Sequence, residues 1–566
     1  MLAVLAVTTA TLAVSQYESW RQSASNQAAF TVGSDVSVDT PVPMLPGQVG
    51  SLADAQGVLA ATPVAIGTNP AGGSALALDP RTAGAAVILR PDLSALPLRT
   101  LWQRIIPSGR PAGLPLPGRP ARIKVTATLR DSSMPKLAAT VTIALQDRFG
   151  IVYRIAAGPL LADGRDHALV APVTAGGQAG DPLRLLGLSL TYQPSPATPG
   201  SLHRSASTDA AMMVKDISLA DSPHGGFARP FADGRQLAAW LPAAADSGVV
   251  GTTSPGASPA ATGLPPSVES WRPAAAGAQE LAFRLGFAPV TPPPSSGQAS
   301  APFVAEVTLT APVANRAIPA IATHAFLQAS GSAVGEKVPL SFAGYSVPAV
   351  IVATVTDFPT VTGTGGALIV DQTAVQAVLA SRWSSPLPIT TWWLRTAGGA
   401  VPPGLPSGTL VTDRERETEK LLADPLTAMP QQGILAVAVA VAILAALGFA
   451  VSVAARRRAG RLEGALLSAL GMSRAAQAGR LCAEELMLAA PAAAAGLAAG
   501  IGLSLLIVPA ITPAPANAPP VQVVLPLPWF SLIALAVAAI PVLLATTGSV
   551  GIGSDAASHL RVAEVP

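Results

Sequence analysis

Few residues in this chain have the types and the spacing that chemistry requires. The pentapeptide DGRDH, Asp163–His167, places two carboxylates beside an imidazole, and such a group could hold a cation. An Asp-Gly pair is also typical of a tight turn between two strands, because glycine adopts a positive φ at little cost. We favour the turn, and we predict that the chain holds no metal and needs no cofactor.

The other reactive residues do not form a catalytic pattern. The motifs H-E-x-x-H and G-x-S-x-G do not occur, so the signatures of zinc proteases and serine hydrolases are missing. In GSAVGEKV, Gly335 is followed by Glu336 and not by the lysine of a phosphate-binding loop. We therefore predict that the chain is not an enzyme and does not hydrolyse ATP by itself. The histidines are scattered at positions 167, 203, 224, 324 and 559.

The overall composition indicates that part of the chain lies in lipid. Hydrophobic residues make up 50% of the 566 residues and charged residues only 12%, whereas soluble domains carry about 25% charge. The net charge of +3 is small for this length, so we expect no nucleic-acid partner. The single cysteine, Cys482, can form neither an intramolecular disulfide nor a cysteine cluster that binds a metal.

Four uncharged runs predict an α-helical membrane domain of about four transmembrane helices. The runs 433–455 and 486–508 each contain 23 residues, and a helix rising ~1.5 Å per residue then crosses the ~30 Å hydrocarbon layer. The run 529–547 begins with two aromatic residues, which favour the headgroup boundary. The run 1–15 is short, and we interpret it as a transmembrane helix whose first turns lie upstream of Met1, with a cleaved signal peptide as the alternative.

Arginine residues set the predicted orientation of these helices. The connection 456–485 opens on three arginines, whereas the connection 509–528 carries no charge. Cytoplasmic connections are enriched in Lys and Arg, so the first connection is predicted to be cytoplasmic and the second external. We expect a multi-pass protein of the plasma membrane, in contact with lipid, with a large extracellular domain before residue 433 and a cytoplasmic tail, 548–566. The residues that set this topology are Arg456, Arg457 and Arg458.

Sequence patterns divide the long external segment into an α+β domain with an inserted all-β sandwich. Short strands with alternating apolar residues between residues 121 and 219 are typical of a jelly-roll-like sandwich. Pro- and Ser-rich stretches follow, and they indicate a linker because they cannot build a core. A run with eight charges, Asp413–Asp424, then predicts a solvated stalk helix. The predicted segments are the first part of the extracytoplasmic core (16–105), the sandwich (106–242), a linker-rich region (243–302), the second part of the core (303–410) and the stalk (411–432).

The stretch RRRAGRLEGALLSALGMSRAAQAGRLCAEELML, residues 456–488, resembles the FtsX-like (MacB-type) permeases of ABC transporters. It is similar to the family pattern R-x-x-E-x-x-x-L-x-A-L-G-x-S, which is followed by a glutamate at the next helix. The resemblance implies a cytoplasmic ABC ATPase as partner, and a second permease chain or a homodimer. The inserted sandwich departs from the compact MacB pattern, so no particular substrate is implied. The matching positions are Arg461, Glu463, Leu470, Gly471, Ser473, and Glu484 or Glu485.

The same stretch carries a narrow apolar stripe at helical spacing, formed by Leu462, Leu466, Ala469 and Leu470. We expect a short amphipathic helix that ends at Gly471, with Ser473 capping the helix that enters the membrane. Such a helix either lies in the membrane interface or inserts into a groove of a nucleotide-binding subunit. We prefer docking on the ATPase, which adds Leu466 to the predicted coupling residues.

Three functions fit this predicted layout. The first is a permease subunit that couples cytoplasmic ATP hydrolysis to a movement of the external domain, for export or release of a substrate. The second is regulation in the manner of FtsX, which transmits force to external cell-wall hydrolases and transports nothing. The third is a membrane-anchored module whose sandwich binds glycan. We rank the third last, because an anchor does not need a short ordered cytoplasmic loop with an apolar face.

Overall fold

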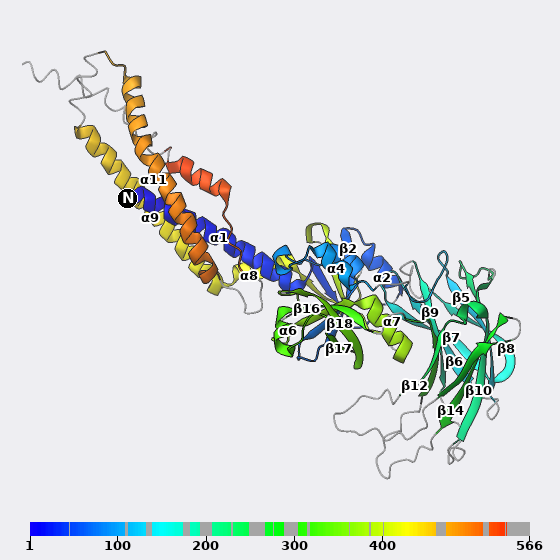
Figure 1. The fold of residues 1–566 in the computed structure, drawn as a ribbon. Coiled ribbons are helices and arrows are strands. Elements are labelled where there is room, and N and C mark those ends of the chain that lie inside the picture. The colour runs from blue at the N-terminus through cyan, green and yellow to red at the C-terminus, as the bar shows by residue number, and fades with distance from the viewer. Residues whose placement is uncertain are drawn as a thin grey trace, which may run out of the picture. The chain divides into compact units, whose positions relative to one another are not determined.

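The computed structural model divides the chain into two compact units (Figure 1). One unit contains Met1–Phe30 and Arg414–Pro566, and the other contains Thr31–Asp413. The structure describes residues 1–44, 46–107, 111–131, 138–173, 182–192, 206–227, 230–247, 267–274, 277–287, 304–313, 317–361, 363–383, 386–399, 401–403, 405–459, 471–512, 520–537 and 539.

A nine-stranded sheet forms the core of the Thr31–Asp413 unit. Its strand order is β17-β18-β16-β19-β3-β2-β20-β1-β21, so strands from both sides of the inserted sandwich share one sheet. Ser341 of β17 also pairs with Thr68 of β2, which closes the strands from β17 to β2 into a ring. The strands are β1 (Val36–Asp39), β2 (Val58–Thr68), β3 (Ser74–Leu78), β16 (Ile318–Thr323), β17 (Lys337–Phe342), β18 (Tyr345–Val355), β19 (Ala367–Asp371), β20 (Thr391–Thr396) and β21 (Leu410–Asp413).

Close approach of two backbones at Gly67 permits this ring closure. A Cβ atom on Gly67 would lie 2.3 Å from the carbonyl oxygen of Ser341 and 2.6 Å from the ring of Phe342. Any larger residue would push β2 and β17 apart, and a glycine inside a strand often marks such a contact. The neighbouring core is filled by large, fully buried side chains, including Trp392 and Phe326.

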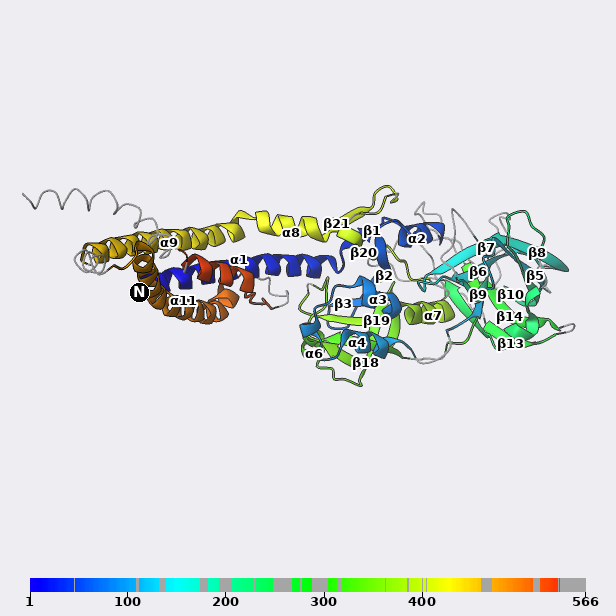
Figure 2. The ribbon, with the colours of Figure 1, turned by 90° about the horizontal axis from the view of Figure 1, so that it is seen from above.

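Helices flank this sheet, and local capping rules explain where two of them begin. Asp79 caps α3 by accepting a hydrogen bond from the Arg81 N–H at 3.1 Å, and Thr323 caps α6 by accepting one from the Phe326 N–H at 3.3 Å. Figure 1 and Figure 2 both place α7 between the sheet and the sandwich, and α7 contacts strands of both. The helices are α2 (Pro46–Ala53), α3 (Pro80–Ala86), α4 (Leu98–Ile105), α6 (His324–Ser330) and α7 (Gln372–Trp383).

Two antiparallel sheets pack together to form the inserted sandwich. One sheet has the order β13-β14-β10-β5-β8 with β11 beside β10, and the other has β12-β15-β9-β6-β7 with β4 beside β9. Alternate residues of both sheets meet in one core, such as Phe283 and Met212 with Ile143 and Leu190. The strands are β4 (Leu114–Pro115), β5 (Arg122–Asp131), β6 (Ala138–Gln146), β7 (Val152–Leu161), β8 (Asp163–Pro172), β9 (Arg184–Tyr192), β10 (Ala206–Ala220), β11 (Pro230–Asp233), β12 (Leu241–Ser247), β13 (Ser267–Pro273), β14 (Gln279–Phe287) and β15 (Val304–Thr310).

The sandwich extends further than residues 106–242, because its strands run from Leu114 to Thr310. Most of β12 and all of β13 and β14 lie in the region predicted as linker, 243–302, and β15 belongs to the sandwich although the sequence places it in the core. The alternating patterns of these strands are short and hard to recognise in the sequence, because Pro-, Ser- and Ala-rich stretches surround them. The rest of the predicted linker, 248–266 and 288–302, lies outside the described residues.

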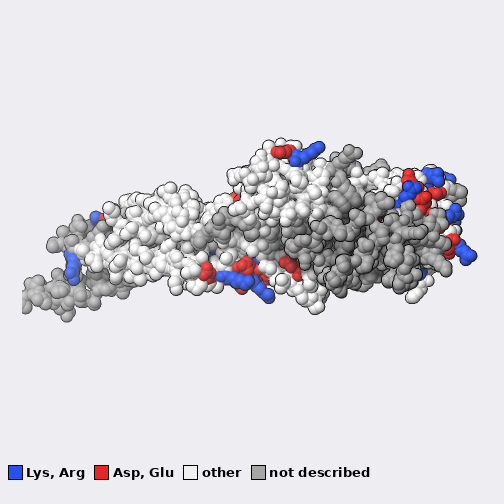
Figure 3. Space-filling model, turned by 90° about the horizontal axis from the view of Figure 1, so that it is seen from below, with Lys and Arg blue, Asp and Glu red and all other residues white. Residues whose placement is uncertain are grey.

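The second unit is built from long helices, and Figure 3 shows a wide uncharged stretch on one face of them. Two helical segments, Pro425–Ser452 and Ala489–Ile511, are long and apolar enough to cross a membrane. The N-terminal helix and the shorter apolar helix Leu527–Val537 do not meet the same conditions, so the described residues supply two such helices and not the predicted four. The unit contains α1 (Leu2–Val32), α8 (Arg414–Ala423), α9 (Pro425–Ala459) and α11 (Arg474–Ile511).

The N-terminal helix is longer than the sequence predicts. Its expected end at residue 15 is the point where polar residues begin, yet α1 continues without a break to Val32. Ser15, Gln16 and Ser19 are all buried inside the helical unit. Polar side chains that are enclosed by other helices do not interrupt a helix, so the change of composition at residue 16 marks no structural boundary.

Candidate functional site

The loop predicted to bind an ATPase begins at the end of α9. This helix ends at Ala459, so Arg456, Arg457 and Arg458 lie in its last turn. Positive charges there interact favourably with the carbonyl end of the helix. The described side chain of Arg458 is exposed. This position is compatible with the predicted role of the arginines in topology, which stays a prediction.

The other end of the loop has the backbone geometry expected from the sequence. Gly471 has a φ of 86°, a conformation that favours glycine. Ser473 is the N-cap of α11, and its Oγ accepts a hydrogen bond from the Ala476 N–H at 3.3 Å. The predicted cap at Ser473 is therefore confirmed. The remaining predicted coupling residues, Arg461, Glu463, Leu466 and Leu470, lie outside the described residues.

One face of α11 consists mainly of small residues that are buried in the helical unit. These residues recur every third or fourth position, which places them in one row along the helix. Small residues in such a row let a second helix approach closely. The row consists of Ala489, Ala493, Gly496, Gly500, Ser504, Val508 and Thr512.

The helix α1 packs against this row. Thr8 Oγ1 donates a hydrogen bond to the carbonyl oxygen of Gly496 at 3.1 Å. A Cβ atom on Gly496 would lie 2.6 Å from Val7 Cβ, and one on Gly500 would lie 2.6 Å from Thr11 Cβ. Only glycine fits at these two positions without moving the helices apart. We call the contact between Val7, Thr8, Thr11, Gly496 and Gly500 the α1–α11 seam.

Two further hydrogen bonds tie α1 to the end of α11 and to the connection that follows it. Gln16 Nε2 donates to Thr512 Oγ1 at 3.2 Å, and the Val524 N–H donates to Ser19 Oγ at 2.9 Å. Thr8 contacts Gly496, and the later residue Gln16 contacts the later residue Thr512. The two helices therefore run in the same direction. Sequence reasoning missed this contact, although two signals carry it. They are the G-x-x-x-G motif Gly496–Gly500 and the small polar residues at every fourth position of α1, namely Thr11, Ser15, Ser19 and Ser23.

After α1, the chain enters β1 through three tightly held residues. Gly33 has a φ of 83°, and a Cβ atom there would lie 2.8 Å from the ring of Trp393. Ser34 is fully buried, with its Oγ 2.6 Å and 2.7 Å from two backbone carbonyl oxygens. Asp35 lies 3.3 Å from Nε of Arg395. The strand β1 then pairs with β20 on one side and with the edge strand β21 on the other, so α1 leads into a strand that is paired on both sides.

The DGRDH pentapeptide is not a turn, because its five residues are the first five of β8, and only Ala162 separates β8 from β7. Gly164 has a φ of 72°, and Nε2 of His167 lies 2.9 Å from Oδ1 of Asp163. Lys215 pairs with Asp166 across the strands. The hydrogen bond from His167 holds the pKa of Asp163 below its usual range, and the hydrogen bond from Lys215 does the same for Asp166. In the part of the chain that the structure describes, no three His, Cys, Asp or Glu residues are grouped so that they could hold a metal.

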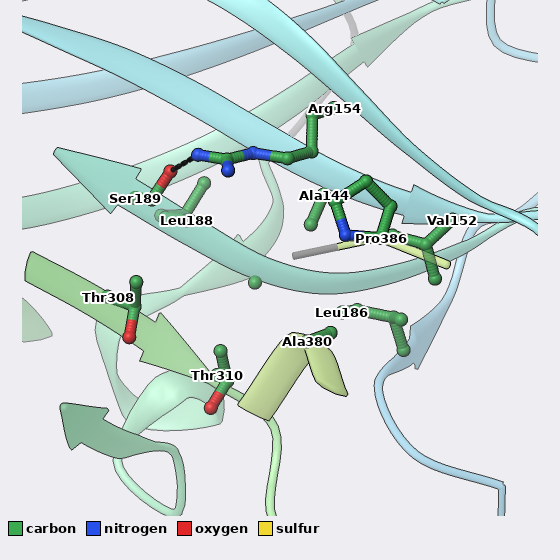
Figure 4. A pocket seen from close by; sticks show the side chains of 11 residues that line it. Ala144, Val152, Arg154, Leu186, Leu188, Ser189, Thr308, Thr310, Ala380 and Pro386 are labelled. Atoms are coloured by element: carbon green, nitrogen blue, oxygen red, sulfur yellow. Dashed lines mark hydrogen bonds between the residues drawn. The ribbon is translucent and has the colours of Figure 1, made fainter. Parts of the chain in front are cut away.

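A shallow hollow lies between the outer face of the β12–β7 sheet and α7 (Figure 4). Figure 4 shows Arg154 reaching across this face to Ser189, whose Oγ lies 3.0 Å from the guanidinium. The same guanidinium pairs with Glu306. Its charge is therefore matched, and the other lining residues are small, aliphatic or threonine. They are Ala144, Val152, Leu186, Gly187, Leu188, Thr308, Thr310, Ala380 and Pro386.

The β6–β7 turn, Asp147–Gly150, docks the sandwich onto the core sheet. Phe149 packs edge to face on Trp392, with ring centroids 5.4 Å apart and planes at 84°. Gly150 has a φ of 77°, and a Cβ atom there would lie 2.5 Å from Oγ1 of Thr373 at the start of α7. These contacts make the turn a close-fitting joint between two parts of the same unit.

The carboxyl group of Asp147 holds this turn in shape. Its Oδ1 accepts hydrogen bonds from the N–H groups of Phe149 and Ile151, both at 2.9 Å, and its Oδ2 accepts one from the Tyr153 hydroxyl at 2.8 Å. Burial raises the pKa of Asp147 to about 7, although these hydrogen bonds and the charge of Arg148 act in the opposite direction. The turn therefore contains a group that titrates near neutral pH.

Comparisons with known proteins identify no family for this chain. A scan against models of protein families finds no match, and a search of curated proteins finds no similar sequence. The similarity to FtsX-like permeases therefore rests on residues 456–488 and on the order of the helices. Function has to be argued from these helices and their contacts.

Proposed function

We propose that the chain is the permease subunit of an ABC transporter, in which a separate cytoplasmic ATPase moves the extracytoplasmic domain to export or release a substrate. The observation that carries the proposal is the chain order. The helix α1 leads into the Thr31–Asp413 domain, and the same domain leads back into α8 and α9. A domain inserted between two helices in this way receives a displacement of either one.

In this proposal the membrane domain has about four crossing helices. The apolar parts of α9 and α11 supply two of them. The helix α1 supplies the third, since the residues that reduce its hydropathy, such as Thr11 and Ser15, are fully buried and would not face lipid. The fourth begins at Trp529, and the structure describes its first part as the helix Leu527–Val537.

The surface of α9 supports a location in the plasma membrane. Leu435, Val437, Leu444 and Leu447 are each about half exposed or more, although they are large and apolar. Exposure of such a surface to water is unfavourable, whereas lipid or a second permease chain would cover it. We assign it to lipid and to a second copy or second permease chain.

The described part of the sandwich gives no support to a glycan-binding anchor. Tyr192 and Phe283 are buried in its core, and none of the sandwich's aromatic residues whose burial is described is largely exposed. A sugar-binding face normally needs an exposed ring as an apolar platform. FtsX-like regulation would use the same helices and the same loop, so it remains the alternative that an experiment has to exclude.

The substitution Leu466→Asp tests the ATPase partnership. If the stripe around Leu466 docks in a groove, the change should cost several kcal/mol of binding, because it removes an apolar anchor and buries an unpaired charge. We expect the ATPase to be lost on co-purification and its stimulated hydrolysis to fall, with insertion of the chain unchanged. Ser468→Asp places the same charge on the opposite side of the predicted helix, so it serves as the matched control.

Two other results would change the assignment. If the Leu466→Asp variant still binds the ATPase and stimulates its hydrolysis fully, the loop lies in the membrane interface and does not couple to an ATPase. An ATPase complex that activates an external cell-wall hydrolase and moves no substrate would identify the regulatory alternative.

A further inference from the structure

We propose that the α1–α11 seam transmits movement from the cytoplasmic loop to the extracytoplasmic domain, with α1 and α11 moving as one body. This inference rests on the proposed function, because it names the path between the ATPase and the domain. The path has three parts, which are the capped start of α11, the seam itself, and the junction between α1 and β1.

The first part is α11, which begins directly after the loop. Ser473 caps the helix, so α11 begins at Arg474, three residues after residue 471, at which the described chain resumes. The helix then continues to Ile511. Any displacement of the loop is therefore applied to the end of one long helix.

The second part is the seam, whose geometry resists sliding. At Gly496 and Gly500 the two helices are so close that even a Cβ atom would overlap α1. Sliding by one helical turn would bring Ala493 opposite Val7 or Ser504 opposite Thr11, and the Cβ atom of either residue would force the helices apart. The hydrogen bond between Gln16 and Thr512 fixes the contact at a second level.

The third part is the exit from α1. Only Gly33, Ser34 and Asp35 separate α1 from β1, and each of them has a close contact with β20. The strand β1 is paired on both sides. A movement of α1 therefore reaches a strand with partners on both sides through three residues that have little freedom of their own.

The other connection to the domain, through α8 and α9, contains a helix break, which favours α1 as the transmitting helix. An apolar window of 18 residues in α9 is 6% buried, compared with 22% for the corresponding window in α11. The chain also breaks its helix between Ala423 and Pro425 before α9 begins. The α9 connection thus contains a joint that can absorb movement.

The test compares Gly500→Leu with Gly502→Leu in the full complex of permease and ATPase. Gly500 lies in the seam, whereas a Cβ atom on Gly502, in the same helix, has no neighbour within 4 Å. The readout is the ATP-dependent change in hydrogen–deuterium exchange of the segment Gly33–Asp39. Binding of the ATPase is measured in parallel by co-purification.

We expect Gly500→Leu to keep ATPase binding within twofold while the exchange response falls about tenfold, a change typical of a lost coupling between sites. Gly502→Leu should match the wild-type chain in both measurements. Thr8→Val removes the hydrogen bond to Gly496 at nearly constant size, so it provides a milder variant if Gly500→Leu is not inserted. It should lower the exchange response by a smaller factor.

The outcomes distinguish a failure of the proposed function from a failure of the seam. If the wild-type chain binds no ATPase, the proposed function is wrong and the transmitting role is lost with it. If the ATPase binds and the exchange response survives both Gly500→Leu and Thr8→Val, the proposed function stands and the seam is not the path. An equal loss in Gly502→Leu would also overturn the seam, because that residue does not contact α1.

Discussion

The two units of this molecule bury opposite kinds of side chain. In the Thr31–Asp413 unit, Trp392 and Phe283 are completely buried. In the helical unit the buried row of α11 consists mainly of Gly, Ala and Ser, whereas Leu444 and Leu506 are 60% and 77% exposed. Water drives large apolar groups inward, so the first arrangement suits an aqueous surrounding. The second suits lipid, in which close contact between small residues holds helices together and large apolar residues face outward.

The free energy that stabilises each unit has a different source. The sheet unit gains free energy by removing apolar area from water. The helical unit gains it by close packing and hydrogen bonds between helices, such as those of Thr8 and Gln16. Substitutions of the same kind should therefore have different effects in the two units.

The largest effect should be an all-or-none result for Cys482. This residue is the only thiol, and it lies in α11 near the predicted cytoplasmic end. An impermeant maleimide should fail to label it in intact cells and should label it once the membrane is opened. A cysteine at Gln522, in a Cys482→Ser background, should react from outside because Gln522 is exposed in the predicted external connection. The reverse labelling pattern would invert the topology.

A smaller effect is the difference in stability that we expect between Phe283→Ala and Leu444→Ala. Removing the buried ring of Phe283 should destabilise the sandwich by about 3–5 kcal/mol. Removing the exposed side chain of Leu444 should change stability by less than about 0.5 kcal/mol. Denaturant unfolding of the full chain in detergent, followed by hydrogen exchange in each unit, measures both. Similar losses at the two sites would break the contrast between the units.

Local rules were sufficient to predict the features that depend on neighbouring residues. The absence of charge located the apolar parts of α9 and α11, and the N-cap preference of serine located the start of α11 at Ser473. Each of these predictions requires only a few adjacent side chains, so a single sequence was enough.

Features that depend on distant residues were missed. Gln16 and Ser19 made α1 look too polar beyond residue 15, because the sequence does not reveal that Thr512 and Val524 contact them. The seam itself joins residues 488 positions apart. The strands β12 to β15 lie among Pro- and Ser-rich residues, and only their pairing partners identify them as part of the sandwich.

The joint between the sandwich and the core sheet should show an effect of another kind, a dependence on pH. Asp147 has a pKa of about 7 in the folded protein, compared with 3.8 for an ordinary carboxyl. From about pH 4 to about pH 7 the unfolded chain has lost this proton while the folded chain keeps it. The free energy of unfolding should therefore fall as pH rises through this range and should then level off, because stability falls wherever the folded state binds more protons.

The substitution Asp147→Asn tests this origin of the pH dependence. Asparagine can accept the hydrogen bonds from the N–H groups of Phe149 and Ile151, and it can donate to the Tyr153 hydroxyl, so the turn should keep its shape. Burial also raises the pKa of Asp371, to about 6, and this carboxyl contributes a change of the same sign. The variant should therefore lose part of the decline in stability between pH 5 and pH 8 and keep the rest. Melting temperatures of both proteins across this range measure the difference, and an unchanged decline in Asp147→Asn would show that Asp147 is ionised in the folded joint, held by its three hydrogen bonds and Arg148.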